Sequence, residues 1–456
     1  MVPLLLSMAV LQTSPVKPEP RQLEWQKMEA NAFVHFGPNT FTSEEWGSGK
    51  ENPNVFAPTA LDCDQWVRTF KDAGLKGVII TAKHHDGFCL WPSKFSTHTV
   101  AQTKWRNGKG DVLKELSAAC RRHGLKFGVY LSPWDRNHPN YGTPEYNETF
   151  KSMLREVLTK YGPVFEVWFD GANGEGPNGK RQVYDWPAFI KTVREHQPKA
   201  VIFSDAGPDI RWVGNEDGHS APTCWSTIDR DRYVPGTPLF AELTEGKQGG
   251  THWVPAECDV SIRPGWFHRA SEDAKVKTPA TLLDLWERSV GQNAVFLLNV
   301  PPNQEGKIAA PDIASLKEWN RLRKSIYGRD LAKGAKVSTR RFMAGHEGET
   351  IVDSKPETYW RTRSYLGPVD VEFDLPRVAT FDRVRLGEAV ENGQQVNSFA
   401  VDAEIDGAWK ELATGTTIGY RRILHVPKTT AKRVRVRFLG AIEMFTLSSF
   451  TLHLSE

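Results

Sequence analysis

The 456-residue chain carries 58 Lys and Arg against 55 Asp and Glu, which leaves a net charge of only +3. This balance argues against the strongly basic surfaces that bind nucleic acid or acidic membranes, so we expect neither partner. Hydrophobic residues make up 39% of the chain, as in ordinary globular proteins, and the length suits two or three domains or one large barrel with an addition. The oligomeric state does not follow from the sequence.

The five cysteines are scattered and show no CxxC spacing, which excludes a disulfide scaffold or a zinc ribbon. An isolated disulfide stays open, and the odd number leaves at least one thiol free. The cysteines are Cys63, Cys89, Cys120, Cys224 and Cys258.

The N-terminus begins with an apolar run at 4–11, followed by polar and Pro-rich residues through Pro20. The run is too short to span a bilayer and resembles the apolar region of a secretory signal, although no Lys or Arg precedes it. We expect residues 1–24 to be a leader and the protein to be periplasmic or extracellular. A disordered tail is the alternative.

From residue 31 to about 302 one pattern repeats: an apolar strand, a loop, an amphipathic helix and a glycine. Strands are expected at 33–37, 77–81, 126–131, 165–170, 201–205, 259–262 and 294–300, and helices at 64–73, 111–123, 150–161, 186–197, 278–290 and 311–327. Such alternation predicts an α/β fold with a parallel sheet. The size favours a (β/α)₈-like barrel over a doubly wound sheet, with irregular units after the fifth strand. No Gly-rich nucleotide-binding motif follows any strand.

After residue 336 the helical period disappears and only alternating runs remain. Asp406-Gly407 lies between two such runs, which is a hairpin signal. We therefore expect a barrel over residues 25–330 and a separate all-β sandwich over residues 336–456.

Polar and aromatic side chains stand where the expected barrel strands end, which is where barrel enzymes place their active sites. The stretch F-E-V-W-F-D-G-A at 165–172 ends its strand in Asp170. One isolated Asp-Gly usually just shapes a turn, and one strand-end His is usually structural. Several strands that end in His, carboxylate or aromatic residues favour a sugar-binding pocket instead. Two acids in such a pocket suffice for glycoside hydrolysis.

A metal site at His84-His85-Asp86 is the rival interpretation of one of these strand ends. Adjacent residues on a strand point to opposite faces, so both histidines could bind one ion only at a bulge. No H-E-x-x-H or H-x-H motif completes a zinc site. We expect no metal and no cofactor.

Six stretches together make the barrel similar to glycoside hydrolase family 29, the α-L-fucosidases. They are F-V-H-F-G (33–37), E-W (45–46), T-A-K-H-H-D-G-F (81–88), G-V-Y-L-S-P-W (128–134), V-W-F-D-G-A (167–172) and W-V-G-N-E-D-G (212–218). The G-N-E-D-G segment resembles the subfamily that acts on α-1,3/1,4-linked fucose. The stretch D-S-K-P-E-T-Y-W (353–360) resembles a galactose-binding-like (discoidin) sandwich, which could bind sugar or buttress the barrel.

The resemblance implies a retaining exo-α-L-fucosidase with Asp170 as nucleophile and Glu216 as general acid/base. A surface-loop role for Glu216 stays open, with Glu257 and Glu242 as alternatives, and Arg263 is expected near the pocket. Contacts to the fucose hydroxyls are implied for His35, Glu45, His84, His85 and Tyr130, and pocket walls for Trp46, Trp168 and Trp266.

Two other functions stay open at this stage. One is a glycan-binding protein on an inactive barrel, and the other is an exo-glycosidase of different specificity. Activity on a chromogenic fucoside separates both from a fucosidase.

Overall fold

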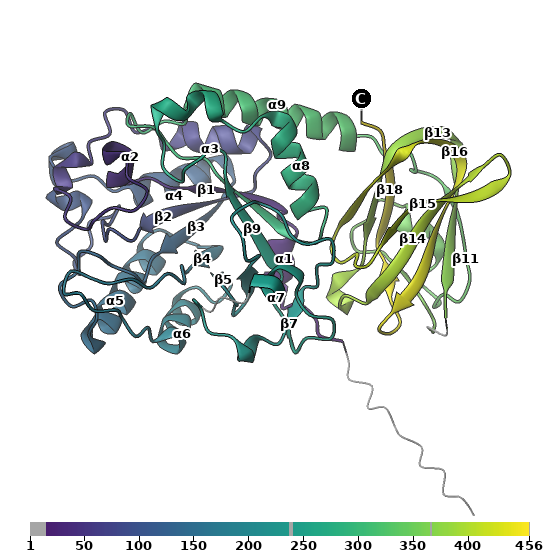
Figure 1. Cartoon of the computed structure of the whole chain (residues 1–456), viewed down its shortest axis with the longest axis horizontal. Coiled ribbons are helices and arrows are strands. Elements are labelled where there is room, and N and C mark those ends of the chain that lie inside the picture. Colours follow the sequence, from purple (N-terminus) through teal and green to yellow (C-terminus); the bar gives the residue numbers. More distant parts are fainter. Residues whose placement is uncertain (1–14, 237–239, 365–366, 456) are drawn as a thin grey trace, which may run out of the picture.

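The computed structural model describes residues 15–236, 240–364 and 367–455 and forms two bodies, a helix-clad barrel and a β-sandwich (Figure 1). Each body has its own hydrophobic core, one built from residues of the barrel and its helices and one from residues of the sandwich. The predicted architecture is therefore confirmed.

Eight parallel strands close the barrel in the order β1-β10-β9-β6-β5-β4-β3-β2. The strands are β1 (Ala30–Val34), β2 (Gly77–Lys83), β3 (Lys126–Leu131), β4 (Glu166–Trp168), β5 (Val201–Ser204), β6 (Ile210–Trp212), β9 (Ala256–Ser261) and β10 (Val295–Asn299). Almost every residue of these strands is buried, as expected for parallel strands covered by helices.

The helices of the barrel are α1 (Pro20–Gln26), α2 (Pro38–Thr42), α3 (Cys63–Asp72), α4 (Val112–His123), α5 (Pro144–Lys160), α6 (Trp186–His196), α7 (Phe240–Glu245), α8 (Pro279–Ser289) and α9 (Ala310–Tyr327). Their ends follow the expected capping chemistry. Asp111 accepts a hydrogen bond from the backbone N–H of Lys114 at the start of α4, and Gly124 ends that helix with φ 76°. Thr278 caps α8 in the same way, with Pro279 in the first turn.

Helices α1, α2 and α7 were not predicted, and the bounds of several strands differ by a few residues. Three further differences bear on the site. Strand β6 was not predicted, because it has only three residues and follows β5 without an intervening helix. Helix α5 begins at Pro144, six residues before the predicted start. Strand β4 stops at Trp168, so Asp170 lies in the loop just beyond the strand.

The sandwich is built around a six-stranded antiparallel sheet with the order β11-β13-β16-β14-β15, in which β18 also pairs with β13. Its strands are β11 (Lys336–Thr339), β13 (Val369–Gly387), β14 (Val396–Ile405), β15 (Ala408–Gly415), β16 (Arg422–Ala441) and β18 (Ser449–His453). Two short pairs complete the strands: β12 (Trp360–Arg361) with β17 (Thr446–Leu447) in the sandwich, and β7 (Thr227–Ile228) with β8 (His252–Trp253) in the barrel. The predicted hairpin joins β14 to β15, and Asp406 and Gly407 both have positive φ.

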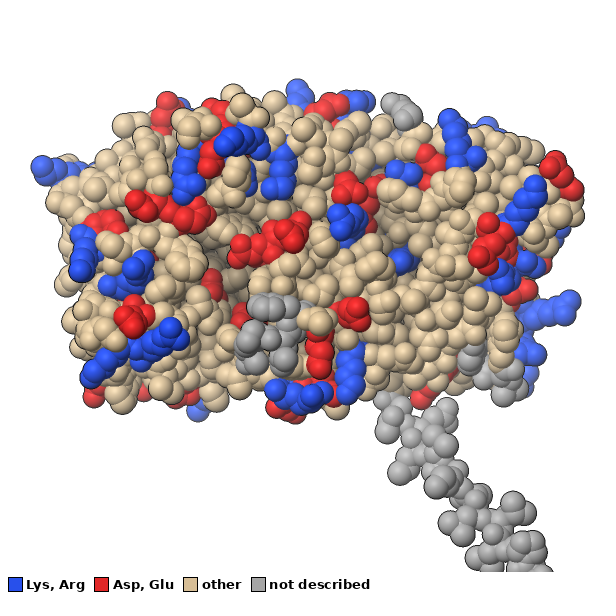
Figure 2. All heavy atoms as spheres, in the orientation of Figure 1, with Lys and Arg blue, Asp and Glu red and all other residues tan. Residues whose placement is uncertain are grey.

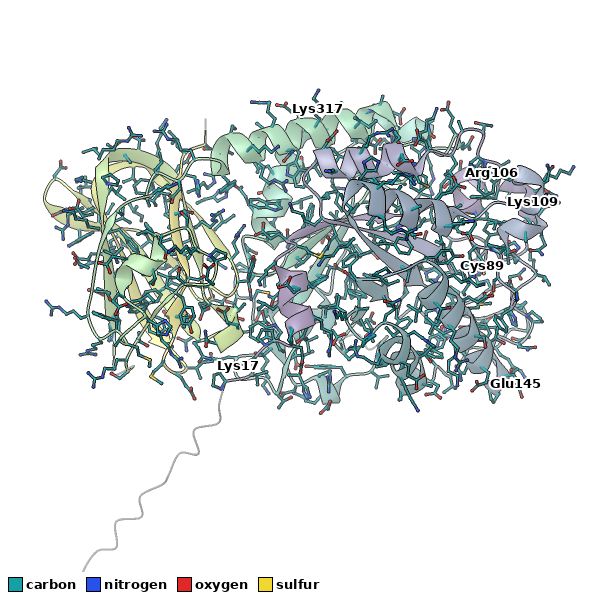
Figure 3. The ribbon with its side chains drawn as sticks, turned by 180° about the vertical axis from the view of Figure 1, so that it is seen from behind. Lys17, Cys89, Arg106, Lys109, Glu145 and Lys317 are labelled. Atoms are coloured by element: carbon teal, nitrogen blue, oxygen red, sulfur yellow. The ribbon has the colours of Figure 1, made fainter. Side chains whose placement is uncertain are left out.

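The sandwich packs against the barrel at the N-terminal ends of the barrel strands. Arg421 pairs with Glu29, which precedes β1, and Asn293, which precedes β10, accepts from the backbone N–H of Tyr420. Arg106 and Lys109, in the segment that follows β2, and Glu145, at the start of the helix α5 that follows β3, lie at the end of the molecule away from the sandwich (Figure 3). The C-terminal ends of the strands therefore open away from the sandwich.

Acidic and basic side chains are interspersed over the face shown in Figure 2, as the small net charge implies. All five cysteines are buried and free. Within the described ranges, no helix is both long and apolar enough to cross a bilayer. The first 14 residues of the predicted leader lie outside the described residues, and its last five belong to α1.

Candidate active site

Asp170 stands just beyond the C-terminal end of β4, with its carboxylate held by two donors. The Tyr130 hydroxyl donates to Oδ2 at 2.9 Å, and the backbone N–H of Ala172 donates to Oδ1 at 2.7 Å. Gly171 leaves room for the Asp205 carboxylate, which would lie 2.3 Å from a Cβ at that position. The carboxylate is thus fixed in one orientation and remains partly exposed.

A cavity of about 710 Å³ opens beside Asp170 and is lined entirely by barrel residues. Glu216, in the loop after β6, lines the same cavity. Its Oε2 accepts a hydrogen bond from the Trp266 indole at 3.3 Å. Thus the structure brings together two acids that are 46 positions apart in the sequence.

The two acids have different surroundings. Burial of the Glu216 carboxyl raises its pKa, whereas the hydrogen bond from Trp266 lowers it. The negative charges of Asp170 and Glu45 raise this pKa further. The residue as a whole is still exposed, so its carboxyl group remains accessible. A raised pKa suits a group that must be protonated to give its proton away.

Three predicted histidines and two aromatic residues form a cluster next to Asp170. His85 Nε2 lies 3.7 Å from Asp170 Oδ2, and its ring centroid is 4.2 Å from that of His84. His35 packs 5.6 Å from His84, and Trp168 stacks on Tyr130 at 5.2 Å. Burial lowers the pKa of His35 to about 3 and that of His85 to about 4, and it lowers the pKa of His84 as well, so the three rings are neutral at pH 7.

The other predicted wall residues extend this cluster to Glu216. Trp266 packs on His35 with 4.9 Å between ring centroids, and Trp46 lies 5.8 Å from His85 and is 56% exposed. Glu45 accepts hydrogen bonds from the backbone N–H of Trp266 and from Arg269. One oxygen of Glu45 thus holds the Trp266 loop, and the other holds Arg269.

Two sequence comparisons bear on what this site does. A family model described as alpha-L-fucosidase matches residues 11–322, and one described as F5/8 type C domain matches residues 335–449. The chain is a member of glycoside hydrolase family 29, the α-L-fucosidases. It is 42% identical to alpha-L-fucosidase 1 of Arabidopsis thaliana over 438 residues, which cover 94% of this chain and 83% of the relative.

Solved α-L-fucosidase structures share the whole architecture. A Ruminococcus gnavus GH29 fucosidase in complex with fucose superimposes with a TM-score of 0.89 and 34% identity, covering 97% of each chain. A glycoside hydrolase 29 family member from an unknown rumen bacterium gives 0.87 and 38%, covering 97% of this chain and 78% of the other.

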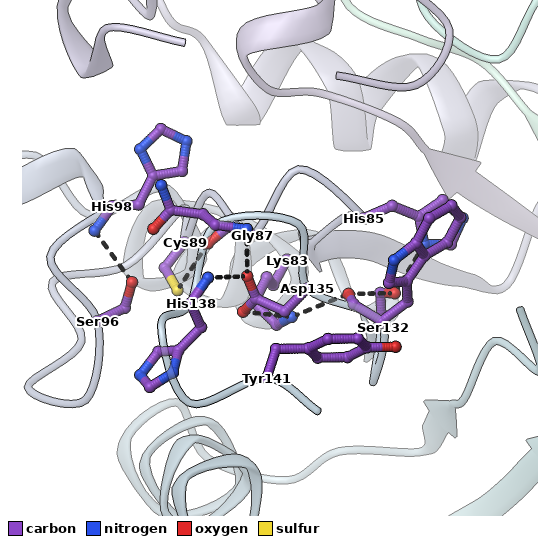
Figure 4. A network of polar contacts seen from close by, with 12 residues as sticks. Lys83, His85, Gly87, Cys89, Ser96, His98, Ser132, Asp135, His138 and Tyr141 are labelled. Atoms are coloured by element: carbon purple, nitrogen blue, oxygen red, sulfur yellow. Dashed lines mark hydrogen bonds and ion pairs between the residues drawn. The ribbon is translucent and has the colours of Figure 1, made fainter. Parts of the chain in front are cut away.

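Beneath His85, the fucosidase barrel buries an ion pair between Lys83 and Asp135 (Figure 4). Lys83 Nζ lies 3.1 Å from Asp135 Oδ2 and also donates to the Tyr146 hydroxyl at 3.3 Å. Burial alone would raise the pKa of Asp135, but Lys83 and two backbone N–H groups lower it. Gly87, with φ 81°, lets the chain pass where a Cβ would lie 2.3 Å from Asp135. This explains the lysine and glycine of the K-H-H-D-G-F motif.

A second pair of acids lies at the floor of the barrel. Glu166 accepts from the Trp25 indole at 2.8 Å and Glu257 from the Trp168 indole at 3.0 Å, and both carboxyls are fully buried. Burial raises the pKa of both, and the charge of Glu166 raises the pKa of Glu257 further, which favours retention of a proton by this pair. Glu257 therefore holds Trp168 and is not part of the cavity wall.

The prediction for Arg263 was wrong. Its guanidinium is buried against Asp312, with Nε 3.0 Å from Oδ1, so it does not face the cavity. Glu242 lies on α7 and does not line the cavity either.

Two further acids line the cavity that sequence reasoning did not select. Asp205 follows β5, and burial together with the charge of Asp170 raises its pKa to about 6. Asp259 lies within β9, accepts from the Trp212 indole at 2.9 Å, and has its pKa raised by burial and by Glu216. Asp205 could have been selected, because it ends the expected strand 201–205, whereas Asp259 begins the expected strand 259–262 and gave no such signal. Over the described parts of the chain, no group of three His, Cys, Asp or Glu side chains is arranged to hold a metal ion.

Proposed function

We propose that this family member is a retaining exo-α-L-fucosidase that removes terminal α-1,3/1,4-linked L-fucose by double displacement. One observation carries the proposal: Asp170 and Glu216 line one cavity, and the surroundings of Glu216 raise its pKa. Retaining glycosidases need one carboxylate to attack and one carboxyl group to give a proton.

In the first step Asp170 attacks the anomeric carbon while the glycosidic bond breaks, and Glu216 protonates the departing oxygen. In the second step Glu216 takes a proton from water, whose oxygen displaces the carboxylate and releases fucose with its configuration retained. Tyr130 supports both steps, because its hydroxyl holds the attacking carboxylate in place. For this mechanism the two carboxyl groups should lie about 5–5.5 Å apart around bound sugar.

The buried cluster next to Asp170 supports fucose as the bound sugar. A relative of the same architecture holds fucose. Here neutral imidazoles and the Tyr130 hydroxyl supply hydrogen-bonding groups, while Trp168 and Trp266 supply flat apolar faces. We infer that His35, His84 and His85 contact the fucose hydroxyls and that Trp46 covers the mouth of the site.

The size of the cavity and the G-N-E-D-G loop support a branched glycan as the source of the fucose. Besides Asp170 and Glu216, the cavity of about 710 Å³ is lined by Asn173, Arg181, Asp205 and Val234. This leaves room for a leaving group larger than one sugar ring. A panel of defined fucosylated oligosaccharides tests the linkage; preference for α-1,2 or α-1,6 linkages contradicts the proposal.

Azide rescue tests the two assigned roles separately. In Asp170→Ala, azide should replace the missing nucleophile and give fucosyl azide of inverted, β configuration. In Glu216→Ala, azide should instead attack the covalent intermediate and give the α product. Glu216→Ala should also slow substrates with poor leaving groups by about 10²–10⁴-fold while sparing activated aryl fucosides. Equal losses on both substrates, or the same azide product from both variants, would overturn the assignment.

We also propose that the protein acts in the periplasm or outside the cell. The apolar run at 4–11, followed by polar and Pro-rich residues, supports this. N-terminal sequencing of the mature protein from the producing cells tests it, and retention in the cytoplasm with the run intact contradicts it.

A further inference from the structure

One buried amide connects the histidine cluster to the loop that carries Trp266. Asn299 is the last residue of β10 and is fully buried. Its Oδ1 accepts from the backbone N–H of His35 at 3.1 Å and lies 2.9 Å from His35 Nδ1. Its Nδ2 donates to the backbone carbonyl of Trp266 at 2.8 Å and to the Ser261 hydroxyl at 2.9 Å.

The two backbone partners determine which end of the amide is oxygen. A backbone N–H can only donate and a backbone carbonyl can only accept, so the Asn299 amide has a single satisfactory orientation. Its oxygen therefore faces His35, and the contact with Nδ1 is a hydrogen bond only if Nδ1 carries the hydrogen. A neutral imidazole with hydrogen on Nδ1 has a lone pair on Nε2 and can only accept there.

We propose that Asn299 is a positioning residue for the reaction, which holds His35 as a hydrogen-bond acceptor at Nε2 and seats the Trp266 loop against Glu216. The fucose hydroxyl that contacts His35 must then donate its hydrogen to Nε2. The site therefore selects for a sugar whose hydroxyl can point its hydrogen toward His35. This inference rests on the proposed function for its catalytic meaning, but the state of His35 can be measured without substrate.

The titratable groups around His35 favour its neutral form. His84 and His85 face it from the loop after β2, and Tyr130 faces it from β3 with 6.1 Å between ring centroids. Burial is the main cause that lowers the pKa of His35; the hydrogen bond with Asn299 raises this pKa but brings no negative charge to Nδ1, and a positive charge on His85 would lower it further.

Nitrogen NMR of the histidine-labelled wild-type protein tests the tautomer directly, with His35→Gln used to assign the signal. We expect one protonated-type shift for Nδ1 and one unprotonated-type shift for Nε2, unchanged from pH 5 to 8. Hydrogen on Nε2, or an imidazolium in that range, would overturn the inference whether or not the protein hydrolyses fucosides.

Asn299→Asp tests the positioning role. The introduced carboxylate keeps both acceptor positions toward His35 but places a negative charge beside Nδ1, so imidazolium accumulates and Nε2 becomes a donor. The acid limb of kcat/KM on an aryl fucoside should move up by about 1–3 pH units, as expected for an opposite charge at this distance.

Asn293→Asp is the matched control, because that amide is equally buried but bonds to Cys224 and Ser226 far from His35. Both variants should lose stability, and only Asn299→Asp should move the acid limb. Equal pH profiles in the two variants would show that Asn299 has only a structural role and would contradict the positioning role. If Asn299→Asp does not fold, the wild-type NMR result still decides the tautomer.

Discussion

Two pairs of acids occupy the same barrel, one at the mouth and one at the floor, and they differ in what surrounds them. Asp170 and Glu216 line an open cavity. Glu166 and Glu257 are fully buried, each accepts an indole N–H, and burial raises the pKa of both. Both pairs consist of carboxylic acids, so access to substrate and solvent separates a catalytic pair from a structural one.

Amide substitution should produce the largest difference between the pairs. Asp170→Asn should lower kcat at least about a thousandfold, whereas Glu257→Gln should change it by less than about threefold. Gln can still accept from the Trp168 indole and carries no charge, so the floor keeps this hydrogen bond. Steady-state assays on an aryl fucoside measure both. A comparable loss in Glu257→Gln would show that the floor pair takes part in the chemistry.

Truncation should expose the structural role of the floor pair. Glu257→Ala removes the acceptor of a buried indole and leaves a cavity, which should lower the free energy of unfolding by about 2–4 kcal/mol. It should also raise KM, because Trp168 lines the active-site cavity. Urea denaturation and steady-state kinetics measure the two effects.

Glu166→Ala is the matched control for this truncation. It removes the hydrogen-bond acceptor of the Trp25 indole on α1, which is not part of the active-site cavity. The free energy of unfolding should fall by a similar amount, and KM should not change. A raised KM in both variants would mean that the whole barrel has loosened.

The floor pair should also make stability depend on pH. Burial raises both pKa values above their ordinary 4.5, so the folded state keeps protons that the unfolded state has already lost. The free energy of unfolding should therefore fall as pH rises above about 4.5, by up to about 1.4 kcal/mol per pH unit for each retained proton. The double variant Glu166→Gln/Glu257→Gln should flatten this slope between pH 5 and 8. An unchanged slope in urea titrations would mean that other groups cause it.

The alternation of apolar strands and amphipathic helices was enough to predict the barrel, because each buried strand and helix cap has a local signature. Besides its length of three residues, strand β6 was missed because its central residue is Arg211, a residue type that is usually exposed. Arg211 is fully buried, and its guanidinium donates to the carbonyls of Leu243 and Trp225. Those partners lie in a distant segment, so no local pattern shows them.

The same limit applies to the site. Residues 166, 168 and 170 alternate along one strand and its end, so a period of two predicts that they share the inner face of the barrel. That pattern singles out Asp170 at the strand end, but it does not show that Glu166 meets Glu257 beneath Trp168. Glu216 was selected through a family resemblance, because a loop carboxylate has no periodicity. The orientation of Asn299 depends on two backbone groups that only the folded chain brings together.

The smallest predicted effect concerns the mouth pair and the exposed neighbour of its proton donor. Asp217 adds to the raised pKa of Glu216, and the active form of Glu216 in the first step is protonated. Asp217→Asn should therefore lower the pKa of Glu216 and move the basic limb of kcat/KM to lower pH. Because Asp217 is exposed, we expect a shift of only about 0.1–0.3 pH units at low salt, which 1 M NaCl should abolish.

Glu145→Gln, an equal change of charge on α5, is the control and should leave the basic limb of kcat/KM in place. If the basic limb stays in the same place both in Asp217→Asn at low salt and in Glu216→Gln, another group that lines the cavity, such as Asp205 or Asp259, sets it.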